Sequence, residues 1–313
     1  GAIHTIVVEG LTDCPGNPIG SGNAASFALP EPVTAGDVVI NEVLYDPIGT
    51  GSDFVELYNR SNKVLGLSEL RLANVTAGVV GAESPITNTA MLLLPGEYVL
   101  LCEDASDVVA NYPHSRTDRF VVMDLPSYNN GLGSVILQNA AGELLDRFDY
   151  NDDLHFELVN NPEGYSLERV SPERPTSDNS NWQTAADVAG RATPGFLNSQ
   201  YAPLPTTSGE LSIAPNIFSP DNDGHQDVLN IAYAFNEPGY VGSMVVYDLA
   251  GREVRWLMNN LLLGTDGVLS WDGLVDGGGL ARMGPYVVAL EAYDPSGEVH
   301  RFKRTVTLAH RLD

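Results

Sequence analysis

The residues best suited to chemistry lie in one short loop in the last third of the chain. This loop reads SPDNDGHQD and carries side-chain oxygens at alternate positions, on Ser219, Asp221 and Asp223, and then, after a glycine, on Asp227. Hard Ca²⁺ takes six to eight oxygen ligands, and a loop with this alternation turns several oxygens toward one point. The spacing therefore predicts a calcium site formed by these four residues.

Two interpretations of this loop stay open on the sequence alone. The twelfth position, where an EF-hand carries a bidentate glutamate, falls on Asn230, so the loop matches that motif only in part. Without a metal, the same Asp and Asn side chains would hold the loop through Asx turns, by accepting hydrogen bonds from the backbone that follows them. We expect either a partial calcium loop or a cluster of such turns.

A second acidic group lies around the run FDYNDDLHFE. Its members are Asp146, Asp149, Asp152, Asp153 and Glu157. Carboxylates grouped in this way hold Mg²⁺ in a nuclease, whereas at the end of a strand they usually form a solvated surface. We expect the solvated surface, and we keep as a separate hypothesis that this group hydrolyses nucleic acid or glycan.

Other signatures of catalysis are absent from the sequence. None of the six histidines pairs with a second ligand at zinc spacing, and there is no HExxH, no GxSxG and no phosphate-cradling glycine loop. We therefore expect no enzyme activity.

The composition limits the classes of binding partner and the cellular compartments that can be expected. The formal net charge is −25, and no Lys or Arg occurs before Arg60. Binding to nucleic acid or to an anionic membrane surface depends on positive charge, so both are disfavoured. Two cysteines, Cys14 and Cys102, are too few for a disulfide framework, and we expect both to be buried single thiols. No apolar run reaches membrane-spanning length.

Short strands separated by turns account for most of the chain. No window keeps apolar residues at helical spacing, and 31 glycines and 20 prolines supply the turns. Strands are expected at 3–9, 38–45, 53–58, 65–73, 90–94, 97–102, 119–123, 133–138, 143–150 and 165–170, and at seven places between 212 and 309. Residues 104–113 are expected to form one or two helical turns with Asp104 or Ser106 as N-cap. The pattern predicts β-sandwiches or closed barrels.

Two segments with the composition of linkers divide the chain. A length of 313 residues exceeds the size at which one core usually stops growing. The runs PEPVTAG at 30–36 and YAPLPTTSGE at 201–210 separate three parts. We therefore expect domains at 1–33, 38–200 and 208–313.

Motifs spread over the middle part carry a family resemblance. They are INEVLYDP, DFVELYNRSN, LLLPGEYVLLC, NNGLGSVILQNAAGELLDRFDY, GYSLERVSP, NWQTA and ATPGFLNSQ. Together they resemble the lamin tail domain, an Ig-like β-sandwich of nuclear lamins and of many secreted bacterial proteins, over residues 38–200.

Several residues of this part are expected to hold the fold. Asn41, Glu42 and Glu56 are expected either to alternate out of a half-buried sheet or to be tied to the backbone. Glu168 and Arg169 are expected to form a charge pair at a strand end. Trp182 is expected to be a large apolar anchor.

The two ends carry further resemblances. The motifs PNIFSPDNDGHQDVLNI, VVYDLAGREVRWL and SWDGLVDGGGLARMGPYVVALEAYDPSG lie within 208–313 and resemble the Ig-like C-terminal domain of flagellar hook-capping proteins. Residues 1–33, in which IHTIVVE leads into GLTDCPGN, resemble the final hairpin of a bacterial Ig-like domain. The resemblances imply an all-β chain of tandem Ig-like β-sandwiches. A hook-capping-type domain at the end of a secreted chain also implies a role in export or surface attachment.

These observations favour a non-catalytic module of a secreted or cell-surface protein of a Gram-negative bacterium, used for adhesion, scaffolding or surface presentation. The alternative is the non-catalytic C-terminal tail of a large secreted hydrolase, a nuclease or protease, whose enzyme domain lies upstream. Expected partners are a surface protein or glycan and the secretion or attachment machinery, with calcium as cofactor. Nucleic acid and membrane insertion are not expected. Tyr112, Tyr128 and Tyr201 are expected to be exposed and available for contacts.

Overall fold

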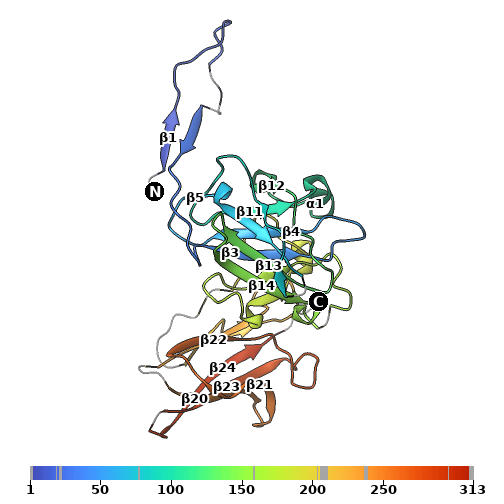
Figure 1. Ribbon diagram of the computed structural model, residues 1–313. Helices are drawn as coiled ribbons and strands as arrows, with labels where there is room; N and C mark the ends of the chain where they lie inside the picture. The colour runs from blue at the N-terminus through green and yellow to red at the C-terminus, as the bar shows by residue number, and fades with distance from the viewer. Residues whose placement is uncertain are drawn as a thin grey trace.

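The computed structural model describes residues 3–18, 20, 23–76, 78–157, 159–202, 204, 211–235, 239–294 and 296–309. The fold of these residues is all-β, as predicted, and consists of two stacked β-sandwiches and a two-stranded ribbon at the N-terminal end (Figure 1). We call residues 38–202 the first sandwich and residues 211–309 the second sandwich.

The N-terminal ribbon pairs β1 (His4–Val7) with β2 (Ala24–Phe27) and projects away from the first sandwich (Figure 1). All four side chains of β1 are exposed. Two strands cannot bury a core, and Cys14 in the connecting loop is exposed. The prediction of a buried Cys14 is therefore wrong, whereas the prediction for Cys102 is confirmed.

The first sandwich packs a six-stranded sheet against a four-stranded sheet. In spatial order the six-stranded sheet consists of β12 (Phe120–Val122), β11 (Tyr98–Cys102), β4 (Phe54–Asn59), β3 (Val38–Leu44), β15 (Leu167–Arg169) and β16 (Trp182–Thr184). The four-stranded sheet consists of β14 (Leu144–Asn151), β13 (Leu132–Asn139), β6 (Leu70–Ala73) and β9 (Ser84–Pro85). Only β11 and β12 are parallel among these described strands.

Shorter elements complete the first sandwich. The paired short strands are β5 (Leu65–Gly66) with β10 (Leu92–Leu93) and β7 (Val75–Thr76) with β8 (Val79–Val80). The 3₁₀ turns are η1 (Leu67–Glu69), η2 (Thr117–Arg119), η3 (Asp152–Leu154), η4 (Asn179–Asn181) and η5 (Asp187–Ala189). The predicted helix is α1 (Ala105–Asn111), and the side chain of its N-cap Asp104 accepts hydrogen bonds from the backbone N–H groups of Ser106 and Asp107.

The core of the first sandwich lies between its two sheets. Trp182 is 1% exposed and stacks on Phe148 with ring centroids 3.6 Å apart, which confirms it as an apolar anchor. Arg169 lies over the Trp182 ring and pairs with Asp146 at 3.3 Å. The predicted pair between Glu168 and Arg169 is wrong, because neighbouring residues of a strand point to opposite faces.

Helix α1 and a segment of residues 191–200, which we call the strap, cover the outer face of the six-stranded sheet. The apolar residues buried there are Leu44, Phe54, Leu100, Cys102, Val108, Tyr112 and Ala192. Glu42 and Glu56 are also buried on this face and accept hydrogen bonds from backbone N–H groups of the strap. Of the two expected arrangements for these glutamates, the tie to the backbone is therefore the correct one.

The three tyrosines expected at the surface differ from one another. Tyr112 is 5% exposed and Tyr128 is 6% exposed, so the prediction for both is wrong. Tyr112 packs edge-on against Phe54 and donates its hydroxyl hydrogen bond to the Gly164 carbonyl. Tyr201, at 41% exposed, lies at the surface as predicted.

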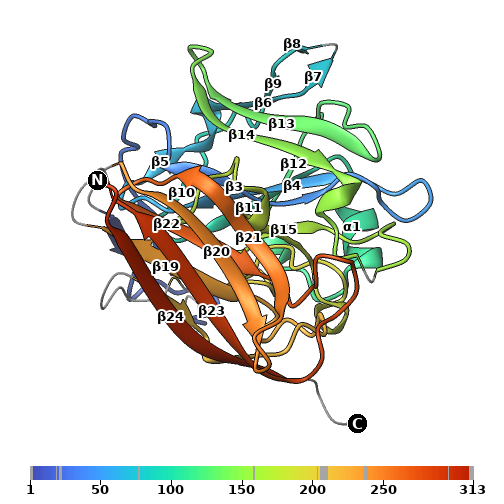
Figure 2. The same cartoon turned by 90° about the horizontal axis from the view of Figure 1, so that it is seen from below.

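In the second sandwich a three-stranded sheet packs against a five-stranded sheet. The three-stranded sheet consists of β17 (Leu211–Ala214), β19 (Leu229–Ala234) and β22 (Asp266–Trp271). The five-stranded sheet consists of β18 (Ile217–Phe218), β24 (Val299–Leu308), β23 (Gly284–Tyr293), β20 (Val241–Asp248) and β21 (Glu253–Leu262) and fills the foreground of Figure 2. The core of the second sandwich surrounds Trp271, which is fully buried against Phe218 and Tyr286. No helix formed by the described residues has the length and apolar character of a membrane span.

Candidate functional site

The structure brings together three of the four predicted calcium ligands in the loop 219–227, which we call the acidic loop. One carboxylate oxygen from each of Asp221, Asp223 and Asp227 lies within 4.8 Å of the other two. Ser219 lies at the base of the loop, where its backbone N–H donates to the Gln226 carbonyl at 2.9 Å. The three aspartates thus form the candidate ligand cluster, and Ser219 closes the loop beneath them.

Asp227 is the most buried of these aspartates, at 8% exposed. Its Oδ1 accepts from the backbone N–H of Asp221 at 3.2 Å, and its Oδ2 accepts from that of Gly224 at 2.7 Å. Burial raises the pKa of Asp227 to about 6, the Gly224 hydrogen bond opposes this rise, and the charges of Asp221 and Asp223 add to it. A bound cation would offset both the burial and the mutual repulsion.

One oxygen of the acidic loop lacks a partner. Asp221 Oδ2 is buried and has no hydrogen-bond partner, while Asp221 Oδ1 accepts from the Asp223 N–H at 3.3 Å. A buried acceptor without a donor is unfavourable, and a hard cation satisfies it directly. Asx-type bonds are present as well, for example from the His225 N–H to Asp223 Oδ1 at 2.9 Å. The carboxylate oxygens therefore fit a divalent cation such as Ca²⁺, and Asx turns hold the same loop.

The residues between these aspartates face the first sandwich. Asn222 donates to the Ala185 carbonyl at 3.1 Å and accepts from Gln200 Nε2 at 2.8 Å. Gly224 adopts φ 77°, and a Cβ at this position would lie 3.1 Å from Cβ of Ser199. The acidic loop therefore directs its carboxylates toward one another and its intervening residues toward the other sandwich, so it is part of the joint between the two.

Arg174 forms a second group of contacts at this joint. It belongs to the first sandwich, is 3% exposed and donates to Ser270 Oγ of β22 at 2.6 Å. Ser270 Oγ donates in turn to Asn230 Oδ1 of β19 at 2.8 Å. Within its own sandwich Arg174 pairs with Asp178 at 2.7 Å. Buried contacts of this kind fix the orientation of the two bodies, because rotation would leave buried polar groups unpaired.

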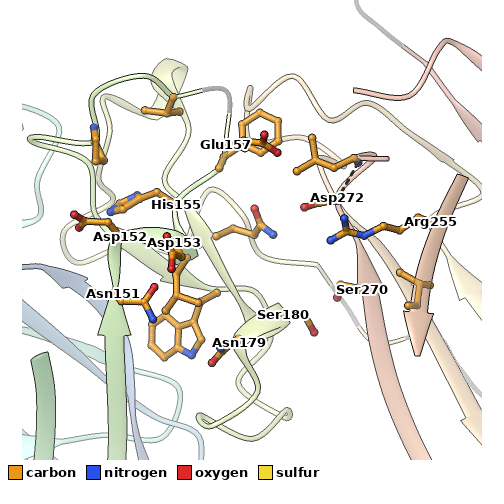
Figure 3. A pocket seen from close by; sticks show the side chains of 18 of the residues that line it. Asn151, Asp152, Asp153, His155, Glu157, Asn179, Ser180, Arg255, Ser270 and Asp272 are labelled. Atoms are coloured by element: carbon orange, nitrogen blue, oxygen red, sulfur yellow. Dashed lines mark hydrogen bonds between the residues drawn. The ribbon is translucent and has the colours of Figure 1, made fainter. Parts of the chain in front are cut away.

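A cleft of about 870 Å³ lies beside these contacts, between the two sandwiches. Figure 3 shows Asp152, Asp153 and His155 on the side of the first sandwich and Arg255 reaching toward them from the second. At one end Glu157 approaches the second sandwich so closely that a Cβ on Gly278 would lie 2.8 Å from its Oε1. The volume falls within the range of about 300–1,000 Å³ that ligand sites occupy.

The lining of this cleft is mostly polar and includes the aromatic residues Phe156, Trp182 and Trp256. Its hydrogen-bonding side chains include Asn151, Asn179, Ser180, Gln183, Ser270 and Asp272, and it also contains Trp256, which is 38% exposed. His155 is buried and its Nδ1 lies 3.1 Å from Thr184 Oγ1. Burial lowers the pKa of His155 to about 4, so the ring is neutral at pH 7. The cleft offers polar groups and ring surface to a ligand.

The acidic residues between 146 and 157 are divided among different roles. Asp146 accepts from the Ile40 N–H at 2.8 Å, and its side chain is 11% exposed, so the prediction of a solvated surface is wrong for it. Asp149 is solvated as predicted, with 60% of its side chain exposed beside Arg147. The other three, Asp152, Asp153 and Glu157, line the cleft.

Sequence reasoning missed the residues that make the joint. Arg174 stands in a loop outside the quoted motifs, and Gln200 ends the motif ATPGFLNSQ, but nothing in the sequence links them to their partners Ser270 and Asn222. The available signal was the acidic loop itself, whose asparagine and glycine between the aspartates are free to contact another surface.

The family comparison concerns the first sandwich. Residues 31–152 match the model of the Lamin Tail Domain family. The lamin tail match covers β3 to β14 and supports an Ig-like sandwich, as the sequence motifs implied. β15 lies beyond the lamin tail match but pairs with β3 inside it, so the same sheet continues past residue 152. The resemblances of 1–33 and 208–313 stay predictions.

No curated protein matches the chain. Among solved structures, dimeric latent PorU from Porphyromonas gingivalis is 12% identical with a TM-score of 0.26, over 87% of this chain and 19% of that one. CopC from Methylosinus trichosporium OB3b is 15% identical with a TM-score of 0.20, over 28% and 79%. SGBP-B of the Bacteroides ovatus mixed-linkage glucan utilization locus is 12% identical with a TM-score of 0.16, over 98% and 52%. Likenesses with TM-scores this low assign no function.

Proposed function

We propose that this chain is a non-catalytic structural and binding module of a secreted or cell-surface bacterial protein, with its domains at 1–33, 38–200 and 208–313. The observation that carries the proposal is the buried joint, in which Arg174 and Gln200 of the first sandwich bond Ser270 and Asn222 of the second. A joint of this kind makes the two sandwiches one rigid spacer, which suits adhesion, scaffolding or presentation. The net charge of −25 keeps such a spacer soluble.

Calcium has a structural role in this proposal. An ion held by Asp221, Asp223 and Asp227 neutralises carboxylates that lie within 4.8 Å of one another. It thereby fixes Asn222 and Gly224, which contact the first sandwich. The ion stabilises the joint and takes part in no reaction.

The cleft beside the joint is the proposed place of binding. Its polar lining and the exposed face of Trp256 suit a surface glycan or a polypeptide segment. Because both sandwiches contribute to the lining, the cleft keeps its shape only while the joint is fixed. The second sandwich also carries the proposed attachment to the secretion or surface machinery, by its resemblance to hook-capping domains.

Calcium titration by isothermal calorimetry, combined with thermal melts in EDTA and in calcium, tests the proposal on the intact chain. We expect calcium to bind and to raise the melting temperature, since calcium at a hundred times its Kd stabilises the folded state by about 2.7 kcal/mol. The double variant Asp221→Ala, Asp223→Ala should lose both effects.

A control variant separates loss of ligands from loss of charge. Glu83 and Asp124 are exposed and lie in the first sandwich, outside the acidic loop. The variant Glu83→Ala, Asp124→Ala changes the net charge by the same amount and should keep calcium binding. Calcium stabilisation that survives loss of Asp221 and Asp223 would refute the assignment and point to a second acidic cluster among the described residues, Asp294, Glu298 and His300.

A further inference from the structure

Three glutamates lie side by side beneath the strap. Glu56 of β4 pairs in register with Glu42 of β3, and Glu42 pairs with Glu168 of β15. All three are 0% exposed, and the donors that contact them are neutral amide and hydroxyl groups. Three buried negative charges without a cation would be very unfavourable. The cluster is therefore expected to retain a proton.

The hydroxyl of Thr193 in the strap bridges two of these carboxyl groups. Thr193 Oγ1 lies 3.2 Å from Glu42 Oε2 and 2.8 Å from Glu168 Oε1. A hydroxyl has one proton to donate and can also accept. One of the two contacts uses the threonine proton, so the other becomes a full hydrogen bond only if the carboxyl group supplies a proton.

The remaining contacts identify the carboxyl group that supplies it. Glu168 Oε2 accepts from the hydroxyl of Ser199 at 2.7 Å and from the next backbone N–H at 2.8 Å, and both bonds favour its ionised form. Glu42 accepts from Ser166 at 2.6 Å and from the Thr193 N–H at 2.8 Å, both at Oε1. Glu42 Oε2 and Glu168 Oε1 each contact the Thr193 hydroxyl alone, at 3.2 Å and 2.8 Å. The shorter contact places the threonine proton on the side of Glu168, which leaves Glu42 Oε2 to carry the retained proton.

Burial, and after it the charge of Glu42, also raises the pKa of Glu56, but the contacts of Glu56 suit a proton less well than those of Glu42. Its Oε1 accepts from Asn41 Nδ2 at 3.0 Å, and its Oε2 accepts from the Gly195 N–H at 2.5 Å. Both oxygens thus face donors, so a proton on either would point at another proton or lack an acceptor.

We propose that Glu42 is protonated at neutral pH and donates through Oε2 to Thr193, which donates to Glu168, so that one retained proton fastens the strap to the sheet. The strap also carries Gln200, whose side chain bonds Asn222 of the second sandwich. Loss of this proton in alkaline solution loosens the strap and, through Gln200, the joint.

The surroundings of Glu42 set the direction of the pH dependence. Burial raises the pKa of Glu42 to about 8, and the charge of Glu168 is the second cause. The ionisable groups that face this region are Glu56 from β4, Glu168 from β15, Tyr112 from the end of α1 and Arg191 from the start of the strap. Tyr112 donates to a carbonyl, and burial raises its pKa, so it stays neutral. Arg191 lies over the ring of Tyr165.

The sign of the effect follows from the raised pKa. Because Glu42 binds its proton more tightly in the folded chain than in the unfolded chain, the proton stabilises the fold. This stabilisation is complete below the ordinary pKa of glutamate, 4.5, and is lost as the pH rises through about 8. The melting temperature of the first sandwich should therefore fall as the pH rises from 4.5 to about 8.

Glu42→Gln and Glu168→Gln form a matched pair of test variants in the full chain. Glutamine has the shape of protonated glutamic acid, and at position 42 its Nε2 can donate to Thr193 as the proposed proton does. At position 168 the amide oxygen can still accept from Ser199 and the strap backbone, but Nε2 then faces the Thr193 hydroxyl, whose proton has no acceptor while Glu42 is protonated. We expect Glu42→Gln to keep its melting temperature within about 2 °C at pH 7, and Glu168→Gln to lose about 5 °C. Glu42→Gln should also remove the fall in melting temperature between pH 4.5 and about 8.

Infrared difference spectroscopy gives a readout that does not depend on stability. The wild-type chain at pH 7 should show the carbonyl stretch of a buried protonated carboxyl group. This band should disappear in Glu42→Gln and persist in Glu56→Gln. A wild-type spectrum without the band would overturn the proposal, as would a Glu42→Gln variant that is destabilised as much as Glu168→Gln or does not fold.

Discussion

Replacing Arg174 by alanine tests whether buried hydrogen bonds hold the two sandwiches together. The change removes the 2.6 Å bond to Ser270 and the 2.7 Å ion pair with Asp178, both made by a side chain at the buried joint. Hydrogen bonds from charged groups contribute about 1.5–3 kcal/mol each, but the Asp178 side chain, 28% exposed, stays partly hydrated in the variant. We therefore expect the free energy of unfolding to fall by about 3 kcal/mol.

Urea unfolding of the full chain, followed by circular dichroism and tryptophan fluorescence, measures this loss. Because the joint couples the two bodies, the wild type should unfold in one transition and Arg174→Ala in two. Arg147→Ala is the control, since its ion pair with Asp149 joins side chains that are 46% and 60% exposed. The control should cost at most about 1 kcal/mol. Equal losses in the two variants, with a single transition in both, would refute the proposed joint.

Two further changes test the joint and the core. Gly224→Ala places a Cβ 3.1 Å from Ser199 at φ 77°, so it should weaken the joint by about 1 kcal/mol in the same urea assay. Gly277→Ala, whose Cβ would meet nothing within 4 Å, should not. A thiol reagent should modify exposed Cys14 in buffer and Cys102 only in urea, because burial raises the pKa of the Cys102 thiol to about 11. Mass spectrometry that finds both thiols modified in buffer would contradict this.

The strands and the acidic loop could be predicted because their signals are local. In β23 buried and less buried side chains alternate along almost the whole strand, and this period of two is visible in the sequence. The alternate oxygens of the acidic loop likewise predict the approach of Asp221, Asp223 and Asp227. Each of these patterns depends on neighbours only a few residues apart.

The joint and the covered glutamates could not be predicted because their partners are distant. Glu42 and Glu56 lie in ordinary strands. Their face of the sheet is buried by the strap, which follows more than a hundred positions later in the chain. Cys14 shows the converse, since it is expected to be buried but lies exposed in the loop between the two strands of the ribbon. The predicted pair between Glu168 and Arg169 is wrong for a local reason. Successive side chains of a strand point to opposite faces, so two neighbouring residues cannot pair.

The strap completes the first sandwich with the last residues of that body, and this sets an order of folding. Asn198 donates to the Asn41 carbonyl, a contact that spans 157 positions of the chain. Contacts this distant form late, because the intervening chain must first be synthesised and its ends brought together. Until residue 200 is available, the glutamates of β3, β4 and β15 stay in water and the sheet stays open.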